Sequence, residues 1–130
     1  MKGKVIRQSV TIKTTPDKVY KAYMDSKTHT RFTNSKAKIS SKVGGTYSTY
    51  GGYATGKNLE LVPDELIRQS WRAENWPDEQ VSEIKLELEP THLGTRITFT
   101  HKGVPDNEFE SIKNGWNEFY WTPMKQLLNE

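Results

Sequence analysis

The spacing of apolar residues changes along the chain from the period of a strand to that of a helix. Residues 5–14 alternate, with Ile6, Val10 and Ile12 on one face and mostly polar side chains on the other. Gln8 is the one polar residue on the apolar face. The pattern predicts a first strand over this segment.

Residues 15–32 have the features of two short helices. Thr15 can cap a helix and Pro16 suits its first position, so a helix is predicted from there to about Met24. A second short helix or turn is predicted over residues 27–32. Both follow the first strand directly.

The middle of the chain, residues 36–101, alternates in short runs separated by glycines and prolines, as an antiparallel meander does. Strands are predicted at residues 36–41, 46–50, 54–62, 66–73, 81–89 and 95–102. The alternation is most regular in residues 81–89, where Ile84, Leu86 and Leu88 are expected to face inward. One face of the sheet is therefore expected to meet water.

A long helix is predicted from Pro105 to the C-terminus. Its apolar residues recur at helical spacing and are Phe109, Ile112, Trp116, Phe119 or Tyr120, Met124 and Leu127. Gly115 is expected to let the helix backbone approach the sheet closely. Pro123 removes a backbone donor and is expected to kink the helix near its end.

Together these elements predict one soluble α+β domain over residues 1–130. A curved antiparallel sheet of seven strands is expected to wrap around the long C-terminal helix, with two short helices after the first strand. One helix is too narrow to fill the concave face of such a sheet, so a cavity or groove is expected between them.

Composition adds an aromatic core and excludes several classes of site. Only 33% of residues are hydrophobic, but they include 4 Trp, 6 Tyr and 4 Phe, which bury a large area each. The absence of cysteine excludes a disulfide framework and a thiolate nucleophile, and a cytoplasmic location is expected. The first ten residues contain no unbroken apolar run, so neither a signal peptide nor a membrane contact is expected.

Charge is distributed unevenly. Residues 1–50 contain 11 Lys and Arg against two acids, whereas the remaining residues contain 8 against 14. The basic half could face an acidic partner, or the two halves could neutralise each other after folding. No basic run is dense enough for a nucleic-acid tract, so no nucleic-acid partner is expected.

Three stretches of the sequence resemble one known family. They are VGGTY at residues 43–47, the run at residues 56–77 that includes LVP and SWRAENWP, and NGWNEFY at residues 114–120. They resemble the C-terminal domain of the activators of the heat-shock protein 90 ATPase, within the START-like (SRPBCC) superfamily. The resemblance extends from about Val10 to Leu128. It implies the helix-grip fold, which the order of the elements predicts independently, and a co-chaperone-like role.

The resemblance transfers function less completely than fold. In the eukaryotic co-chaperones a separate N-terminal domain contributes much of the chaperone binding, and this protein is expected to lack that domain. Contact with a heat-shock protein 90-type ATPase is therefore an alternative function, and the protein is expected to be a monomer. The candidate partner-binding residues are Lys18, Lys21, Lys27, Arg31, Lys36 and Lys38.

Large rings of the sheet and of the long helix are expected to face one another. The candidate ligand-binding residues are Tyr47, Trp71, Trp76, Phe99, His101, Trp116, Phe119 and Tyr120. They either line an apolar pocket for a small hydrophobic ligand or fill the core against one another. Trp76 is expected on a loop, where its ring would cover the pocket or meet a partner.

Catalysis is the least favoured function. His29, His92 and His101 have no spacing that suggests a shared metal, and neither a Ser/His/Asp order nor a glycine-rich phosphate loop is present. No metal, cofactor or catalytic residue is therefore predicted, and a cyclase- or hydrolase-like enzyme is only a remote alternative. His101 shares the inward parity of its strand and is expected to act as a binding group on the concave side.

Overall fold

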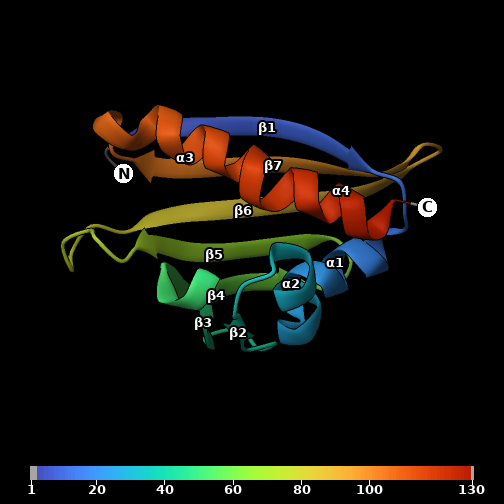
Figure 1. The fold of residues 1–130 in the computed structure, drawn as a ribbon, viewed down its shortest axis with the longest axis horizontal. Coiled ribbons are helices and arrows are strands. Elements are labelled where there is room, and N and C mark those ends of the chain that lie inside the picture. The colour runs from blue at the N-terminus through green and yellow to red at the C-terminus, as the bar shows by residue number, and fades with distance from the viewer. Residues whose placement is uncertain (1–2, 130) are drawn as a thin grey trace.

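The seven strands of the computed structural model, which describes residues 3–129, form one antiparallel sheet in the order β1-β7-β6-β5-β4-β3-β2 (Figure 1). The strands are β1 (Lys4–Ile12), β2 (Lys38–Ile39), β3 (Thr46–Thr49), β4 (Ala54–Val62), β5 (Leu66–Ala73), β6 (Ser82–Thr91) and β7 (Gly94–Val104). Each strand is antiparallel to its neighbours. The predicted α+β class and the seven-stranded sheet are confirmed.

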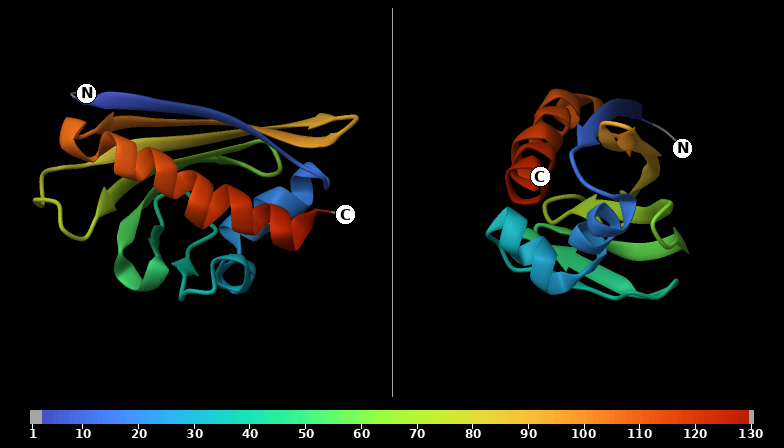
Figure 2. Two further views of the ribbon diagram at one scale, coloured as in Figure 1. Left: turned by 45° about the horizontal axis from the view of Figure 1, so that its top comes forward. Right: turned by 90° about the vertical axis from the view of Figure 1, so that its right-hand side faces the viewer.

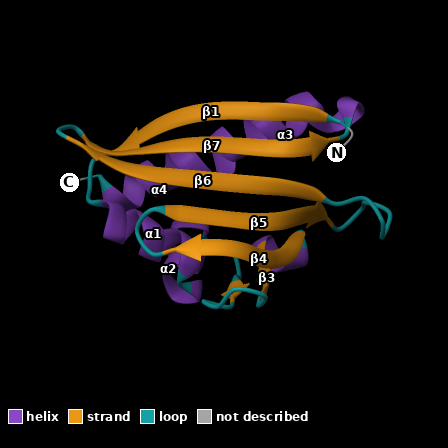
Figure 3. Ribbon diagram, turned by 180° about the vertical axis from the view of Figure 1, so that it is seen from behind, coloured by secondary structure: helices purple, strands orange, loops and turns teal. Residues whose placement is uncertain are grey.

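The helices lie on one side of this sheet. They are α1 (Pro16–Met24), α2 (Ser26–Thr33), α3 (Phe109–Trp116) and α4 (Thr122–Leu128), with the turns η1 (Tyr50–Gly52), η2 (Asp106–Glu108) and η3 (Asn117–Trp121). The path from α3 through η3 to α4 is continuous and crosses the curved sheet, with α1 and α2 beside α4 (Figures 1 and 2). Seen from behind, the strands stand in front of all the helices (Figure 3). The predicted helix-grip arrangement is confirmed.

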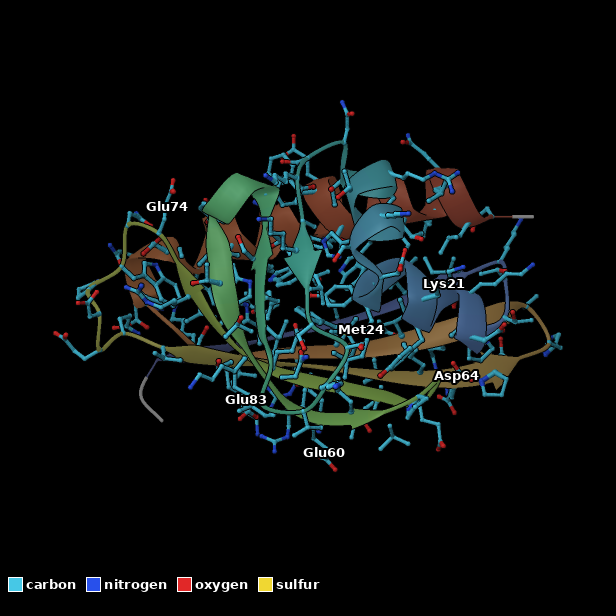
Figure 4. The ribbon with its side chains drawn as sticks, turned by 90° about the horizontal axis from the view of Figure 1, so that it is seen from below. Lys21, Met24, Glu60, Asp64, Glu74 and Glu83 are labelled. Atoms are coloured by element: carbon cyan, nitrogen blue, oxygen red, sulfur yellow. The ribbon has the colours of Figure 1, made fainter. Side chains whose placement is uncertain are left out.

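The sheet separates a buried apolar face from a charged outer face. Ile84 and Leu86 are completely buried, and Leu88 is 6% exposed, as the alternation predicts. On the outer face, Arg68 forms ion pairs with Glu60 and Glu83, which lie on the side of the sheet away from the helices (Figure 4). The inward side chains of β5, β6 and β7 thus form the surface on which the long helix packs.

β2 is much shorter than the strand predicted over residues 36–41. Hydroxyl groups of α2 bind the backbone beside it, because Ser26 Oγ accepts from the N–H of Ile39 at 2.8 Å and Thr30 Oγ1 accepts from the N–H of Ala37 at 3.1 Å. Side chains of this kind compete with strand pairing for backbone groups. The edge of the sheet is therefore closed by α2.

The long helix contains a π turn that its sequence pattern does not predict. In η3 the N–H of Thr122 donates to the carbonyl of Asn117, five residues back. The wider turn rotates the side chains that follow it. Within the turn, Tyr120 and Trp121 are buried, whereas Phe119 is 50% exposed. Tyr120, and not Phe119, continues the predicted apolar stripe.

This turn takes the place of the kink predicted at Pro123. The backbone angles of Trp121 and Thr122 stay helical, so the chain remains helical up to the proline. Because Pro123 has no N–H, the carbonyl of Phe119 lacks its α-helical donor. The hydroxyl of Tyr50 supplies one, donating to this carbonyl at 2.5 Å.

Gln8, the polar residue on the apolar face of β1, forms hydrogen bonds with the helix around the π turn. The N–H of Asn117 donates to Asn114, and the Gln8 amide Nε2 donates to the carbonyl of Lys113 at 3.0 Å. Gln8 Oε1 accepts from the indole Nε1 of Trp121 at 2.7 Å. One side chain thus joins β1 to the helix both before the π turn and at its last residue.

Replacing Gln8 with leucine should lower the free energy of unfolding by about 1–3 kcal/mol. The Gln8→Leu substitution leaves the indole N–H of Trp121 and the carbonyl of Lys113 without partners in a largely buried place. Urea unfolding followed by circular dichroism measures this change. Ser9→Ala, on the exposed face of the same strand, is the control. Equal stabilities for the two variants would contradict this role of Gln8.

Candidate functional site

A cavity of about 420 Å³ lies between the long helix and the strands β4 and β5. Its lining residues are Tyr50, Tyr53, Ala54, Trp71, Ser111, Ile112, Gly115, Trp116, Phe119 and Tyr120. Trp71, Trp116 and Tyr120 are nearly completely buried, whereas Tyr53 is 40% and Phe119 is 50% exposed. The first three therefore form its inner wall, and the last two stand where it opens to solvent.

The six aromatic rings of the cavity contact one another in sequence. Their centroid separations are 6.1 Å for Tyr53–Trp71, 6.3 Å for Trp71–Trp116, 4.7 Å for Trp116–Tyr120, 5.7 Å for Tyr120–Tyr50 and 5.8 Å for Tyr50–Phe119. We refer to these six rings as the aromatic belt. The belt leads from one side of the opening, through the inner wall, to the other side.

Gly115 lies in the wall of the cavity and not against the sheet. A Cβ atom built on it would meet only the ring of Phe119, at 3.6 Å, which is an ordinary contact. The prediction that Gly115 allows close approach to the sheet is therefore wrong. A glycine inside a helix costs about 1 kcal/mol relative to alanine. Here the missing side chain leaves space in the cavity.

His101 is completely buried beneath the cavity wall, where it forms part of a hydrogen-bonded chain. The indole Nε1 of Trp116 can only donate, and it donates to His101 Nδ1 at 3.1 Å. The proton of the neutral ring is therefore on Nε2, which donates to Ser82 Oγ at 2.8 Å, and this hydroxyl donates to the carbonyl of Trp71 at 2.7 Å. Because Nε2 is protonated, His101 cannot act as a base toward Ser82.

His29, on α2, is buried in the same way on the other side of the cavity wall. Its Nδ1 donates to the carbonyl of Tyr23 at 2.9 Å, and its Nε2 accepts from the hydroxyl of Tyr120 at 3.2 Å. Its ring also lies 4.9 Å from that of Phe32. His29 thus ties α2 to a residue of the aromatic belt.

Burial keeps both histidines neutral. Desolvation lowers the pKa of His101 to about 3 and that of His29 to about 4, although the hydrogen bond to the carbonyl of Tyr23 opposes the shift of His29. Neither ring opens into the cavity, and the lining residues include no acid, lysine, arginine or histidine. Within residues 3–129, no three His, Asp or Glu side chains come close enough together to hold a metal ion.

Four of the eight predicted ligand-binding residues line the cavity, namely Trp71, Trp116, Phe119 and Tyr120. The structure does not bring the other four, Tyr47, Trp76, Phe99 and His101, into its lining. Sequence reasoning also missed Tyr50 and Tyr53. Their signal was their position on either side of the glycines of η1, which was interpreted only as a turn.

Tyr47 and Phe99 pack elsewhere in the core. The hydroxyl of Tyr47 donates to the carbonyl of Ser70 at 2.6 Å, and its ring lies over Gly56, where any Cβ would come within 1.9 Å of that carbonyl oxygen. Phe99 is completely buried, 4.5 Å from the ring of Trp116. Both residues shape the sheet behind the cavity.

Trp76 is 5% exposed. The predicted alternative in which its ring is exposed on the loop to meet a partner is therefore wrong. Its ring packs at 5.3 Å from that of Trp71, and its Nε1 donates to Glu108 at 2.9 Å. Trp76 therefore supports the inner wall of the cavity from behind.

The six predicted partner-binding residues are all exposed, on α1, α2 and the segment that leads into β2. They are Lys18, Lys21, Lys27, Arg31, Lys36 and Lys38. Arg68, Arg72, Lys85 and Arg96 form ion pairs with acids between residues 60 and 89. Lys18 aside, none of the six forms an ion pair with another described residue. The acidic half of the chain therefore does not pair with these five cations.

The sequence matches the family model of the Activator of Hsp90 ATPase homolog 1-like proteins over residues 13–129. The chain belongs to this family. A mouse relative named activator of 90 kDa heat shock protein ATPase homolog 1 is 28% identical over 118 residues, which is 91% of this chain. The human protein of that name is 27% identical over the same length. The chain spans about a third, 35%, of the length of these curated family members.

Solved structures agree on the fold of the family. An HSP90 activator from Plasmodium falciparum has a TM-score of 0.89 and 23% sequence identity, covering 96% of both chains. The Aha1 dimer from Colwellia psychrerythraea has a TM-score of 0.84 and 23% identity, covering 98% of this chain and 97% of that one. In residues 3–129, no helix is long and apolar enough to cross a membrane.

Acid should destabilise the protein below about pH 6.5, because unfolding releases His101 and His29 to bind protons that the folded state excludes. Each of the two contributes a slope of up to about 1.4 kcal/mol per pH unit until the pH reaches its folded pKa. In His101→Gln the amide can still accept from Trp116 and donate to Ser82 but does not titrate. Urea unfolding between pH 6 and 5 should therefore show a slope smaller by one proton, and an unchanged slope would contradict the neutral buried ring.

Proposed function

We propose that this chain is a non-catalytic binding domain that holds a small apolar ligand between the long helix and the sheet. The observation that carries the proposal is Gly115, a helical glycine with room for a side chain at the wall of an aromatic cavity. Packing does not require a glycine there, and helix stability disfavours it. Space for a ligand accounts for both facts.

The lining favours binding over catalysis. General acid or base chemistry needs a titratable side chain within hydrogen-bonding reach of the substrate. Tyrosines are the only titratable residues in the described lining, and burial raises the pKa of Tyr50 to about 12 and that of Tyr120 still further. His101 has both ring nitrogens engaged behind Trp116. A cyclase- or hydrolase-like reaction would lack its proton carrier.

Filling the space beside Gly115 should remove ligand binding without harming the fold. Gly115→Leu should weaken binding of the neutral apolar probe N-phenyl-1-naphthylamine by at least about tenfold, because its side chain takes up the apolar area that the probe would bury. Probe fluorescence measures this affinity. Asn114→Leu adds the same side chain at an exposed neighbouring position and is the control. Equal affinity in the two variants would reject this cavity as the site.

Gly115→Ala tests whether the glycine is needed for its backbone conformation or only for the space that it leaves in the cavity. Because the added Cβ meets only Phe119 at 3.6 Å, the substitution should raise the free energy of unfolding by up to about 1 kcal/mol. Thermal and urea unfolding measure this change. A loss of stability would mean that the backbone at this position needs glycine, and the argument from Gly115 would fail.

A second function, contact with a heat-shock protein 90-type ATPase, is favoured by family membership and by the basic surface. The mouse and human relatives are named activators of that ATPase. Lys21, Lys27, Arg31, Lys36 and Lys38 are exposed and have no ion pair with another described residue, so they are available to an acidic partner. Such charges attract a partner over about 8 Å at physiological salt.

A groove beside this basic surface is also lined by cationic and hydroxyl side chains. Its lining includes the cations Lys38 and Lys57 and no carboxylate, whereas its third cation, Arg72, already pairs with Asp78 and donates to the carbonyls of Trp76 and Pro77. The hydroxyl residues of the lining are Ser26, Ser40, Thr46, Tyr47, Ser48, Thr55 and Ser70. Hydroxyl and cationic groups are donors for the carboxylates of a partner. The groove adjoins α2 through Ser26, so a partner bound to the cations of α2 could also reach it.

Charge reversal on α1 and α2 should weaken such a contact. Lys21→Glu combined with Lys27→Glu should lower the affinity for the heat-shock protein 90-type ATPase of the same organism by about tenfold and reduce its salt dependence. Calorimetric titration at low and high salt measures both. The matched control is Lys85→Glu with Lys102→Glu, on the outer face of the sheet. The proposal fails if both pairs have the same effect or if no binding is detected.

A further inference from the structure

Two carboxylates act on Tyr53, which lies at the opening of the cavity. The N–H of Glu74 donates to the carbonyl of Tyr53 at 2.8 Å, which places Glu74 beside this lining residue. Glu108 accepts from Trp76 Nε1 behind the inner wall. Burial raises the pKa of Tyr53, and the negative charges of Glu108 and Glu74 raise it further. The described residues give neither carboxylate a basic partner among their ion pairs.

Basic side chains near the helix turn away from this opening. Lys113 lies on α3 between lining residues, but its ammonium group is over the ring of Phe109, 5.8 Å from the centroid. Lys4 is over the same ring at 5.1 Å. Phe109 is not part of the lining. These two ammonium groups are therefore held at Phe109, outside the lining, whereas Glu108 and Glu74 act on Tyr53.

The aromatic belt adds the same preference inside the cavity. Its neighbouring rings meet at angles of 73°, 48°, 40°, 75° and 70°, so they surround the space from different directions and do not form one stack. The faces of aromatic rings carry partial negative charge and attract cations, most strongly where water is excluded. Six such rings with no competing lysine or arginine favour a positively charged guest.

We infer that the ligand of this cavity is an organic cation, with a quaternary ammonium group on an apolar body. This inference rests on the proposed function, since it specifies the ligand of the same cavity. A carboxylate ligand finds no cation in the lining. A primary ammonium would bring three charged N–H donors into a lining whose only side-chain acceptors are neutral hydroxyl groups, so it would lose more hydration than the cavity replaces. A quaternary ammonium has no N–H to satisfy and loses little water.

Two probes of the same shape test the charge alone. Phenyltrimethylammonium and tert-butylbenzene differ only in the central atom of the trimethyl group, which is nitrogen with a positive charge or neutral carbon. Nuclear magnetic resonance can follow binding of each through the indole N–H signals of Trp71 and Trp116, both in the cavity wall. Gly115→Leu should abolish binding of either probe, which ties the signals to the cavity.

Phe119→Leu distinguishes the attraction of a cation to an aromatic ring from plain apolar contact. Phe119 is half exposed, so leucine keeps an apolar side chain there without disturbing the core. The substitution should weaken phenyltrimethylammonium by about three- to tenfold, because one ring face is lost, and change tert-butylbenzene by less than about twofold. Glu74→Gln should likewise weaken only the cation. Asp78→Gln, an exposed acid farther along the same loop, should leave both affinities unchanged.

The outcomes distinguish the proposed ligand-binding function of the cavity from the inference that its ligand is a cation. Selective weakening of the cation supports the inference. If tert-butylbenzene binds and the ammonium does not, or if Phe119→Leu weakens both equally, the cavity is a plain apolar site and only the cationic ligand is rejected. If neither probe binds, the proposed ligand-binding function fails together with the inference.

Discussion

The π turn at Asn117–Trp121 determines which side chains of the long helix meet the sheet. It is fixed from both sides by side-chain hydrogen bonds, since Gln8 binds the carbonyl before it and Tyr50 binds the carbonyl that Pro123 leaves without a donor. With the extra residue in place, Trp121 reaches β1 and Phe119 turns outward. The helix is therefore sealed against β1 and leaves a cavity on the side of β4 and β5.

The sealed and open parts of the interior are held by different interactions. In the sealed part, buried polar groups are joined in a hydrogen-bonded chain from Trp116 through His101 and Ser82 to the carbonyl of Trp71. Such a network is strong in a dry interior and fixes the position of the helix. Next to it, the lack of a side chain at Gly115 leaves apolar surface uncovered. A rigid wall beside an unfilled space is the arrangement a preformed site needs.

The strands and the fold were predictable because strand side chains repeat with a period of two. Once Ile84 and Leu86 face inward, the register of β6 and its neighbours follows, and the order of the elements gives the helix-grip fold. The helix was harder, because a period of 3.6 residues does not reveal one inserted residue, and Trp121, which the apolar stripe did not include, is buried while Phe119 is half exposed. The cavity was harder still. Parity places Phe99 on the inner face correctly but does not show that Trp116 covers it.

The position of the basic residues relative to the cavity was also not predictable from the sequence. Counting charges in the sequence shows that the first half of the chain is basic. Only the structure shows that Lys27 and Arg31 form no ion pair with another described residue, and that their helix, α2, is hydrogen-bonded to the cavity lining. Tyr120 lines the cavity, and its hydroxyl donates to His29 on α2, between Lys27 and Arg31 in the sequence. The two proposed binding surfaces therefore meet through one buried hydrogen bond. A ligand packed against Tyr120 would touch the residue that helps to position the basic helix, so the two functions share a structural element rather than exclude one another.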